Sequence, residues 1–451
     1  MKLLLYSWNA NNEQVLADNL IKLGFEVIWF RKECRHYTRD MELAMEMIPF
    51  IHAKSVEAVI SFNYFPIISM ICNTCKIPYY SWVYDCPHFT LYAKQVTLPC
   101  NHIGIFDREM VRQLGEYEVR TVSHVPLSVD TAYFARMVAQ TSQEEKKKYQ
   151  CDISFVGSLY TGEYDYYDKV ISGAYNSKMK DSGEASDADW GNGPNSLTGG
   201  KTIEAGKESE ALAPDIERIL DRQCFSYQMD YLKQGVEGGK IDLNKIQTRM
   251  EKQGLMLGED YFAKPEDILM AAVLEKKVTV KERRILLTEI AKRFGGKTDS
   301  EKHVGNDGQT DQKYDIRLYT GSDTEELSEL DALNHGTVDY HTQMPLVFAG
   351  SRINLNISLR SIHSGIPLRV LDIMACGGFV LSNWQPEIAE RFVDGVEIAT
   401  FDSLGDCLDK IAYYLVHEDE RNQVATAGQR KVQELFSYQS GLEKLFSFEI
   451  E

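Results

Sequence analysis

The chain has 451 residues, more than one ordinary hydrophobic core requires, so we expect two domains that each fold around their own interior. Its apolar fraction of 43 % and charged fraction of 26 % are typical of a globular protein in water. The 49 basic and 67 acidic side chains give a net charge of −18, which argues against a nucleic acid or an anionic lipid surface as the main partner. An anionic ligand would therefore need a local basic pocket.

The N-terminal stretch MKLLLYSWNANNEQ has a short apolar run and one lysine, which fits neither a signal peptide nor a membrane-spanning helix. The nine cysteines are scattered, which is typical of reduced thiols in a reducing compartment. Cys72 and Cys75 form the one close pair and are interpreted as small apolar side chains on a helix. The sequence thus predicts a cytoplasmic protein.

The first 125 residues alternate strand and helix signals. Apolar runs such as KLLLYSW, EVIWF, VEAVISFN, IPYYSWVYD and HIGIFD predict buried strands, and NEQVLADNLIKLGF has apolar residues at helical spacing. This alternation predicts a parallel sheet with helices on both faces. We assign residues 1–135 to an N-terminal Rossmann-like domain and the polar residues 136–150 to a linker.

A second α/β domain is predicted over 151–430, beginning with the strand CDISFVGSLY. It carries an insertion at about 161–312, in which 161–215 is rich in Gly, Ser, Asp and Asn and its middle is interpreted as a mobile segment. Helical patterns return over 215–295, as a lid or as a substrate-specific subdomain. Residues 431–451 are assigned to C-terminal helices.

The stretch LRSIHSGIPLRVLDIMACGG, residues 359–378, predicts an anion site at a helix start. Ser364 is the expected cap and Pro367 suits the first turn, so the helix should begin near 365–367, and its free N–H groups would attract phosphate. Arg369 would bind a diphosphate, and Asp372, three residues later on the same side, would accept hydroxyl hydrogens from ribose. An exposed ion pair between Arg369 and Asp372 explains their spacing equally well.

Further candidates follow predicted strands, where ligands bind in open parallel sheets. In the N-terminal domain, Asp85 and His88 of the segment YDCPH could take a proton from a substrate, although an Asp-initiated turn before proline is the alternative. Asn9 and Asn12 could line the site, with a helix cap as the alternative for them. Gly157 and Ser158 follow the first strand of the second domain.

The segment AGSRINLNISLRSIHSGIPLRVLDIMACGGFVLSN, with residues 345–446 around it, resembles the C-terminal domain of GT-B glycosyltransferases, in particular the spore-maturation CgeB-like group. The N-terminal half, through LYSWN and IPYYSWVYDCPH, is more weakly similar to the acceptor-side domain of that group. The resemblance implies two Rossmann-like domains facing a cleft. It implies a donor site formed by Gly157, Ser158, Arg360, His363, Ser364, Gly365, Arg369 and Asp372.

In the related retaining enzymes, two acids eight positions apart hold the donor. Asp372 takes the place of the second acid, which implies a ribose contact, but Ser364 stands in the place of the first. Retaining or inverting stereochemistry therefore stays open. If the transfer is inverting, Asp85 or His88 would be the general base.

The expected activity is that of a hexosyl or N-acetylhexosaminyl transferase, which moves a sugar from a nucleoside-diphosphate donor, with uridine as the guessed base, to a protein or glycan acceptor. The resemblance implies that no metal or other cofactor takes part. A sugar-nucleotide epimerase of the same fold, and a non-catalytic pseudo-glycosyltransferase that supports a partner subunit, are the alternatives.

Overall fold

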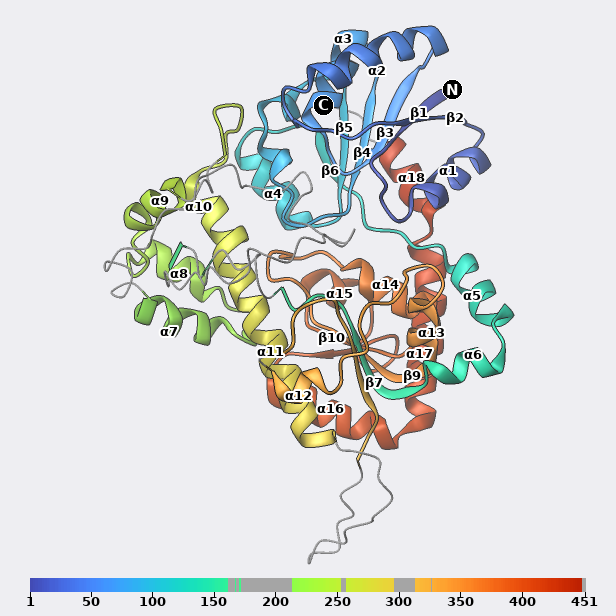
Figure 1. Cartoon of the computed structure of the whole chain (residues 1–451), viewed down its shortest axis with the longest axis vertical. Helices are drawn as coiled ribbons and strands as arrows, with labels where there is room; N and C mark the ends of the chain where they lie inside the picture. The colour runs from blue at the N-terminus through green and yellow to red at the C-terminus, as the bar shows by residue number, and fades with distance from the viewer. Residues whose placement is uncertain are drawn as a thin grey trace, which may run out of the picture.

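The computed structural model describes residues 1–160, 167, 170–171, 213–252, 257–295, 313–325 and 327–447. Most of the polar stretch 161–215, including the middle that was interpreted as mobile, lies outside the described residues, as does nearly all of the polar loop 295–312. Figure 1 shows two α/β lobes, one above the other, with a group of helices to one side of both.

The N-terminal lobe is a six-stranded, wholly parallel sheet in the order β2-β1-β3-β4-β5-β6. Its strands are β1 (Lys2–Ser7), β2 (Glu26–Arg31), β3 (Ala58–Phe62), β4 (Tyr79–Val83), β5 (Asn101–Ile105) and β6 (Val122–His124). Its helices are α1 (Glu13–Lys22), α2 (Met41–Lys54), α3 (Pro66–Cys75) and α4 (Arg108–Glu116), with two 3₁₀ turns, Phe89–Tyr92 and Lys94–Thr97.

Strand β1 shows why this sheet is covered on both faces. Its side chains alternate, so that Leu4 and Tyr6 belong to one buried cluster while Leu3 and Leu5 belong to another. All four are fully buried, which explains the uninterrupted apolar run in the sequence.

The C-terminal lobe is a five-stranded parallel sheet in the order β11-β10-β9-β7-β8. Its strands are β7 (Cys151–Val156), β8 (Ile316–Tyr319), β9 (Ser351–Asn356), β10 (Val380–Asn383) and β11 (Ala399–Phe401). Its helices are α12 (Ser328–Asp331), α13 (Met344–Gly350), α14 (Leu368–Ala375), α15 (Pro386–Arg391), α16 (Leu404–Val416) and α17 (Glu418–Leu435).

The chain passes between the lobes twice. It leaves the N-terminal lobe through α5 (Thr131–Gln140) and α6 (Gln143–Lys148), and it returns after α17, so that α18 (Tyr438–Phe446) packs on the N-terminal sheet (Figure 1). Gly441 is required there, because a Cβ atom at this position would lie 2.3 Å from the indole of Trp82. The predicted C-terminal segment 431–451 is thus divided between the end of α17 in one lobe and α18 in the other.

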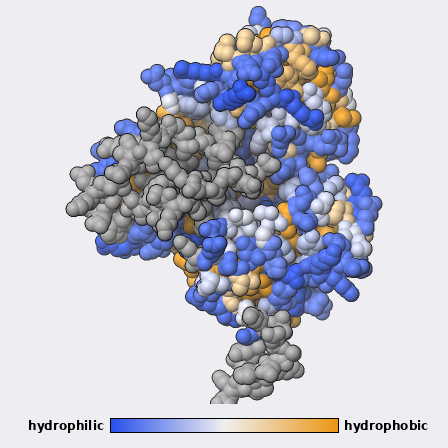
Figure 2. Space-filling view, viewed as in Figure 1, coloured by the Kyte–Doolittle hydropathy of each residue, from blue (hydrophilic) through white to orange (hydrophobic). Residues whose placement is uncertain are grey.

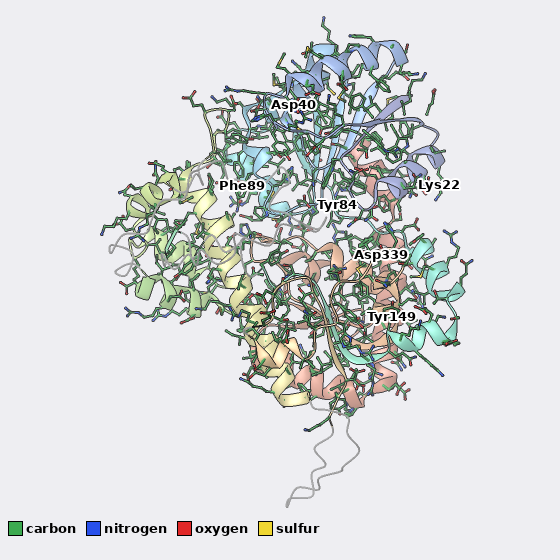
Figure 3. The ribbon with its side chains drawn as sticks, in the orientation of Figure 1. Lys22, Asp40, Tyr84, Phe89, Tyr149 and Asp339 are labelled. Carbon is green, nitrogen blue, oxygen red and sulfur yellow. The ribbon has the colours of Figure 1, made fainter. Side chains whose placement is uncertain are left out.

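The insertion between β7 and β8 is helical. It contains α7 (Ala213–Gln223), α8 (Tyr231–Glu237), α9 (Leu243–Lys252), α10 (Pro265–Ile268), a π-helical turn (Leu269–Leu274) and α11 (Glu275–Phe294). Its own apolar cluster also takes in Phe89 of the N-terminal lobe, which Figure 3 labels on the side of that lobe nearest the insertion. Arg39 pairs with Asp260 at 2.9 Å, and Tyr117 donates a hydrogen bond to Asp267 at 2.5 Å. The insertion therefore bridges the two lobes.

These observations confirm the predicted fold class: two Rossmann-like α/β domains of the GT-B type, with a helical insertion in the second. In the part of the chain that the structure describes, no helix is long and apolar enough to cross a membrane. The face seen in Figure 2 is mostly hydrophilic, with apolar side chains gathered near the upper end of the N-terminal domain.

Candidate functional site

The loops after the carboxyl ends of the two sheets meet between the domains, and Asp107 is central to the contact. This residue follows β5 and caps α4 by accepting hydrogen bonds from the N–H groups of Glu109 and Met110. The same carboxylate accepts hydrogen bonds from the backbone N–H of His363 at 2.6 Å and from that of Ser364 at 3.3 Å. In the loop that was predicted to bind phosphate, the N–H groups of His363 and Ser364 thus donate hydrogen bonds to a carboxylate of the other domain.

Ser364 is not the helix cap that its position before Pro367 suggested. Helix α14 begins at Leu368, with Pro367 at the cap position, and the Ser364 hydroxyl instead lies 2.7 Å from Asp107 Oδ1 and 2.9 Å from Glu387 Oε1. Glu387, at the start of α15, also lies 2.9 Å from His124 Nε2 of the N-terminal domain. Burial raises the pKa of Glu387, but the hydrogen bond and charge of His124, with hydrogen bonds from Arg108 and Ser364, together outweigh burial, so the pKa is lowered.

Gly365 allows the two domains to approach closely. A Cβ atom at this position would lie 2.7 Å from the ring of Phe106 and 2.9 Å from the Phe106 carbonyl oxygen. Because a backbone atom is one of these neighbours, a side chain here would force the domains apart. The glycine is therefore explained by the interdomain contact rather than by access for a phosphate alone.

His363 lies where both domains and the insertion meet. Its Nε2 is 2.7 Å from Glu275 Oε1 on α11, and its Nδ1 is 3.2 Å from Gln113 Nε2 on α4. Burial lowers the pKa of His363, but the carboxylates of Glu275 and Asp107 outweigh that effect and raise it to about 9. The imidazole is therefore positively charged at neutral pH.

Arg360 points toward the insertion. Its guanidinium pairs with the buried Glu282 of α11 at 2.9 Å, donates a hydrogen bond to the Gln223 carbonyl at 2.7 Å and lies 4.2 Å from the centre of the Tyr227 ring. The Arg360 guanidinium thus binds groups of its own domain and its insertion, and not Asp372. The structure therefore does not bring Arg360 together with Arg369 and Asp372.

Arg369 and Asp372 do form a pair, at 3.4 Å. The alternative of an exposed ion pair is nevertheless wrong, because the carboxylate is buried. The side chain of Asp372 is 2 % exposed and that of Arg369 is 28 % exposed. Burial raises the pKa of Asp372 to about 6, although Arg369 and a hydrogen bond from Tyr340 lower it. The Arg369 guanidinium also lies 5.4 Å from the centre of the Phe348 ring.

Gly157 and Ser158 follow β7, as predicted, and are held by their neighbours. The Ser158 carbonyl accepts a hydrogen bond from the buried Arg283 of α11, and the Ser158 hydroxyl lies 3.1 Å from that of Ser322. A Cβ atom on Gly157 would lie 3.3 Å from the ring of Phe155, so this turn leaves little room for a side chain.

Asp85 follows β4 and is half-buried on the side of the N-terminal domain that faces the C-terminal domain; its neighbour Tyr84 is labelled in Figure 3. Burial raises the pKa of Asp85 to about 7, against a 2.5 Å hydrogen bond from Asn63 Nδ2. Asn63 follows β3, and its Oδ1 accepts the N–H groups of Tyr84 and Asp85. A carboxyl group that titrates near neutrality can act as a general base.

His88 differs from Asp85. Its side chain is fully buried beneath Tyr64, whose backbone N–H lies 3.1 Å from the His88 Nε2 atom, and burial lowers the pKa of His88 to about 4. A neutral, enclosed imidazole of this kind belongs to the interior of the domain.

The loop between β1 and α1 is shaped by Glu13, which is buried and accepts hydrogen bonds from Ser7 and from two backbone N–H groups of the loop. Asn9 is exposed and has a left-handed backbone with φ 69°. Asn12 stands at the cap position of α1, but its side chain donates across the domains to Tyr340 Oη at 3.2 Å.

Sequence reasoning missed four residues that shape this region: Asn63, Asp107, Tyr340 and Glu387. Asn63 and Asp107 each follow a predicted strand, so the rule that singled out Asp85 could have found them. Tyr340 and Glu387 have no such signal, because their roles depend on partners that are distant in sequence. Among the described residues, no group of three or more His, Cys, Asp or Glu side chains could hold a metal ion.

A family model described as "Glycosyl transferase-like" matches residues 308–447, which include β8 to β11 and the loop 359–367. No curated protein matches the sequence. The fold and the family match together support a GT-B glycosyltransferase.

Several solved structures are similar over 99 % of this chain. A glycosyltransferase from Rickettsia africae is 11 % identical, with 96 % of that chain covered and a TM-score of 0.47. Anabaena Alr3699/HepE in complex with UDP-glucose is 7 % identical, with 98 % covered and a TM-score of 0.49. WaaG, a glycosyltransferase of lipopolysaccharide biosynthesis, is 8 % identical, with 98 % covered and a TM-score of 0.44. Because these identities and scores are low, the fold is assigned from the strand order and the two facing domains themselves.

Proposed function

We propose that this protein transfers a sugar from a nucleoside-diphosphate donor to an acceptor, with uridine as the donor base, without a metal ion. The observation that carries this proposal is the pairing of Asp372 with Arg369 close to Tyr84 of the N-terminal domain, the chain neighbour of Asp85. The glycosyltransferase family match over residues 308–447 supports it, since it covers both Arg369 and Asp372.

In the proposed reaction, Asp372 accepts hydrogen bonds from the ribose hydroxyls, and Arg369, together with the cationic His363, stabilises the negative charge that develops on the leaving diphosphate. The acceptor hydroxyl attacks the anomeric carbon, the bond to the diphosphate breaks, and the hydroxyl proton leaves. For inversion, Asp85 takes that proton; for retention, the leaving phosphate takes it and Asp85 only positions the acceptor.

The acceptor is proposed to be a protein or a glycan and the transferred group a hexose or an N-acetylhexosamine, as in the CgeB-like group that the sequence resembles. A cytoplasmic location is part of the same proposal. We also propose that no cofactor takes part and that the cationic groups listed above supply the charge stabilisation that a metal ion would otherwise give.

The test is incubation of the purified protein with a panel of nucleotide sugars, with and without EDTA. Release of free nucleoside diphosphate that is unaffected by EDTA is expected. Formation of an isomeric nucleotide sugar without release would identify an epimerase instead.

The position of Asp107 on the N–H groups of the loop 363–364 favours a second candidate, a non-catalytic protein that supports a partner subunit. Turnover that is absent from the isolated protein with every donor, and that needs a second glycosyltransferase, would favour this candidate over the first.

A further inference from the structure

A chain of hydrogen bonds runs from the N-terminal domain to Asp372 through Tyr340. Asn12 Nδ2 donates to Tyr340 Oη at 3.2 Å, and the Tyr340 hydroxyl donates to Asp372 Oδ1 at 2.9 Å. A phenol has one proton. Because Asn12 donates to the phenol oxygen, the proton of Tyr340 is directed to the carboxylate. Arg369 Nη1 lies 3.4 Å from the other carboxylate oxygen.

The backbone around Tyr340 holds the phenol in this place. Tyr340 lies in the loop before α13, in a turn where the Asp339 carboxylate accepts hydrogen bonds from the N–H and the hydroxyl of Thr342 at 2.8 and 2.6 Å. The rings of Tyr340 and of Phe134 on α5 pack in an edge-to-face arrangement, with 6.2 Å between the ring centres. Figure 3 labels Asp339 on the part of the C-terminal domain nearest the N-terminal domain.

We propose that Tyr340 is a positioning residue for nucleotide recognition: its hydroxyl orients the Asp372 carboxylate and favours its ionised form, which accepts the ribose hydroxyls. This inference rests on the proposed function, in which Asp372 binds ribose. It adds that Asn12 of the N-terminal domain sets the direction of the phenol proton, so the arrangement of the two domains influences recognition of the nucleotide.

The groups that face Asp372 come from several elements. Arg369 shares α14 with it, Cys376 directly follows that helix, Tyr84 follows β4, and Tyr438 belongs to α18. Burial raises the pKa of Cys376 and of each of these tyrosines, Tyr340 included, away from neutrality. Asp372, with its pKa raised to about 6, is therefore the member of this group that titrates between pH 5.5 and 9.

The experiment is calorimetric titration of the full chain with uridine, guanosine and adenosine diphosphates between pH 5.5 and 9. In the parent, affinity should fall as the pH drops through about 6, because protonated Asp372 is a poorer acceptor. In Tyr340→Phe the midpoint should move to higher pH. Compared with the parent at the same pH, the affinity should fall about 2- to 10-fold at pH 7, as expected for one hydrogen bond, and should equal that of the parent at pH 9, where His363 has lost the same charge in both.

The matched control is Tyr133→Phe, which removes a phenol of the same interface that donates to the His341 carbonyl at 3.3 Å and does not touch Asp372. Its pH profile should equal that of the parent. His341→Gln should also leave the midpoint in place: the His341 ring packs against that of Tyr340, with 5.0 Å between the ring centres, but its Nε2 lies 2.8 Å from the Asn11 carbonyl oxygen and not on Asp372.

The inference would be overturned if Tyr340→Phe had the same pH profile as the parent, or if it lost affinity equally at every pH. It would also be overturned if the midpoint disappeared in His341→Gln. Asp372→Asn distinguishes failure of the role of Tyr340 from failure of the proposed function. If it weakens binding while Tyr340→Phe matches the parent, only the role of Tyr340 fails. If it leaves affinity and pH dependence unchanged, or if none of the three nucleotides binds the parent, the proposed function fails and the inference fails with it.

Discussion

The Ser364 hydroxyl of the C-terminal domain lies 2.7 Å from the Asp107 carboxylate of the N-terminal domain, although 257 residues separate them in the chain. Glu387 lies 2.9 Å from the same hydroxyl, so one serine joins two buried carboxylates. The hydroxyl has one proton, so it donates to one of the two carboxylates at a time, and both lie at the boundary between the two domains.

Ser364→Ala should therefore destabilise the protein. One of the two buried carboxylates would lose its hydrogen-bond donor, since the hydroxyl has one proton, and a buried group left without its partner costs about 1–3 kcal/mol. Chemical denaturation at neutral pH measures this change. Ser328→Ala, at an exposed serine whose hydroxyl donates to its exposed neighbour Glu329, is the control and should leave the free energy of unfolding within about 0.5 kcal/mol of the parent. Equal stability of the two variants would contradict the role of Ser364.

Gly365→Ala should push the two domains apart. Its Cβ atom would meet the Phe106 ring and carbonyl at 2.7 and 2.9 Å, and overpacking of this kind costs about 1–3 kcal/mol. Small-angle X-ray scattering should report a larger radius of gyration than in the parent. The control is Gly405→Ala on α16, where no described atom outside its own helical turn lies within 4 Å of the added carbon, and it should leave the radius unchanged.

His363 should make stability depend on pH. Its pKa is about 9 in the folded protein and about 6.5 when unfolded, so its contribution is complete below pH 6.5 and is lost as the pH rises through 9. The free energy of unfolding should fall between pH 6.5 and 9.5, and this fall should shrink in Glu275→Gln, which removes the main partner of the imidazolium. An undiminished fall in the variant would assign the effect to other groups.

Asp85→Asn tests the proposed base. For an inverting transfer, loss of a general base should lower kcat about 10²- to 10⁴-fold, while the parent should lose activity as the pH falls through about 7 and Asp85 takes up a proton. Measurement of kcat and KM from pH 5.5 to 9 checks both effects. A kcat within a few-fold of the parent, with a raised acceptor KM, would restrict Asp85 to positioning the acceptor.

Arg369→Ala should weaken the binding of nucleoside diphosphate by about 1.5–3 kcal/mol, the cost of one charge-assisted contact. Calorimetry gives the affinity, and circular dichroism checks that the fold is intact. Arg430→Ala, at an exposed position on α17, is the control and should bind as the parent does. An unchanged affinity in Arg369→Ala would remove this residue from the donor site.

The architecture could be predicted because each strand satisfies a local rule. Buried parallel strands need continuous apolar runs, and KLLLYSW and VEAVISFN supply them, so β1 and β3 lie where they were expected. The carboxyl end of β4 likewise placed Asp85 at the sheet edge that faces the other domain.

The site was harder to predict, because its contacts join distant segments. Ser364 has the local pattern of a cap, yet contacts with Asp107 and Glu387 outweigh that local preference and α14 begins later. Arg360 and Arg369 look equivalent in the sequence, but the buried Glu282 of the insertion binds only the first of them. No spacing rule reports which carboxylate will face which arginine after folding.

The return of α18 to the N-terminal domain has a consequence for biosynthesis. Trp82 is buried beneath Gly441 and the ring of Tyr438, so the first domain to leave the ribosome lacks part of its interior until almost the whole of the second has been translated. A fragment that stops at residue 135 would expose this indole surface to water. The N-terminal domain is thus first in synthesis but last to be completed, and the two halves mature as a single unit.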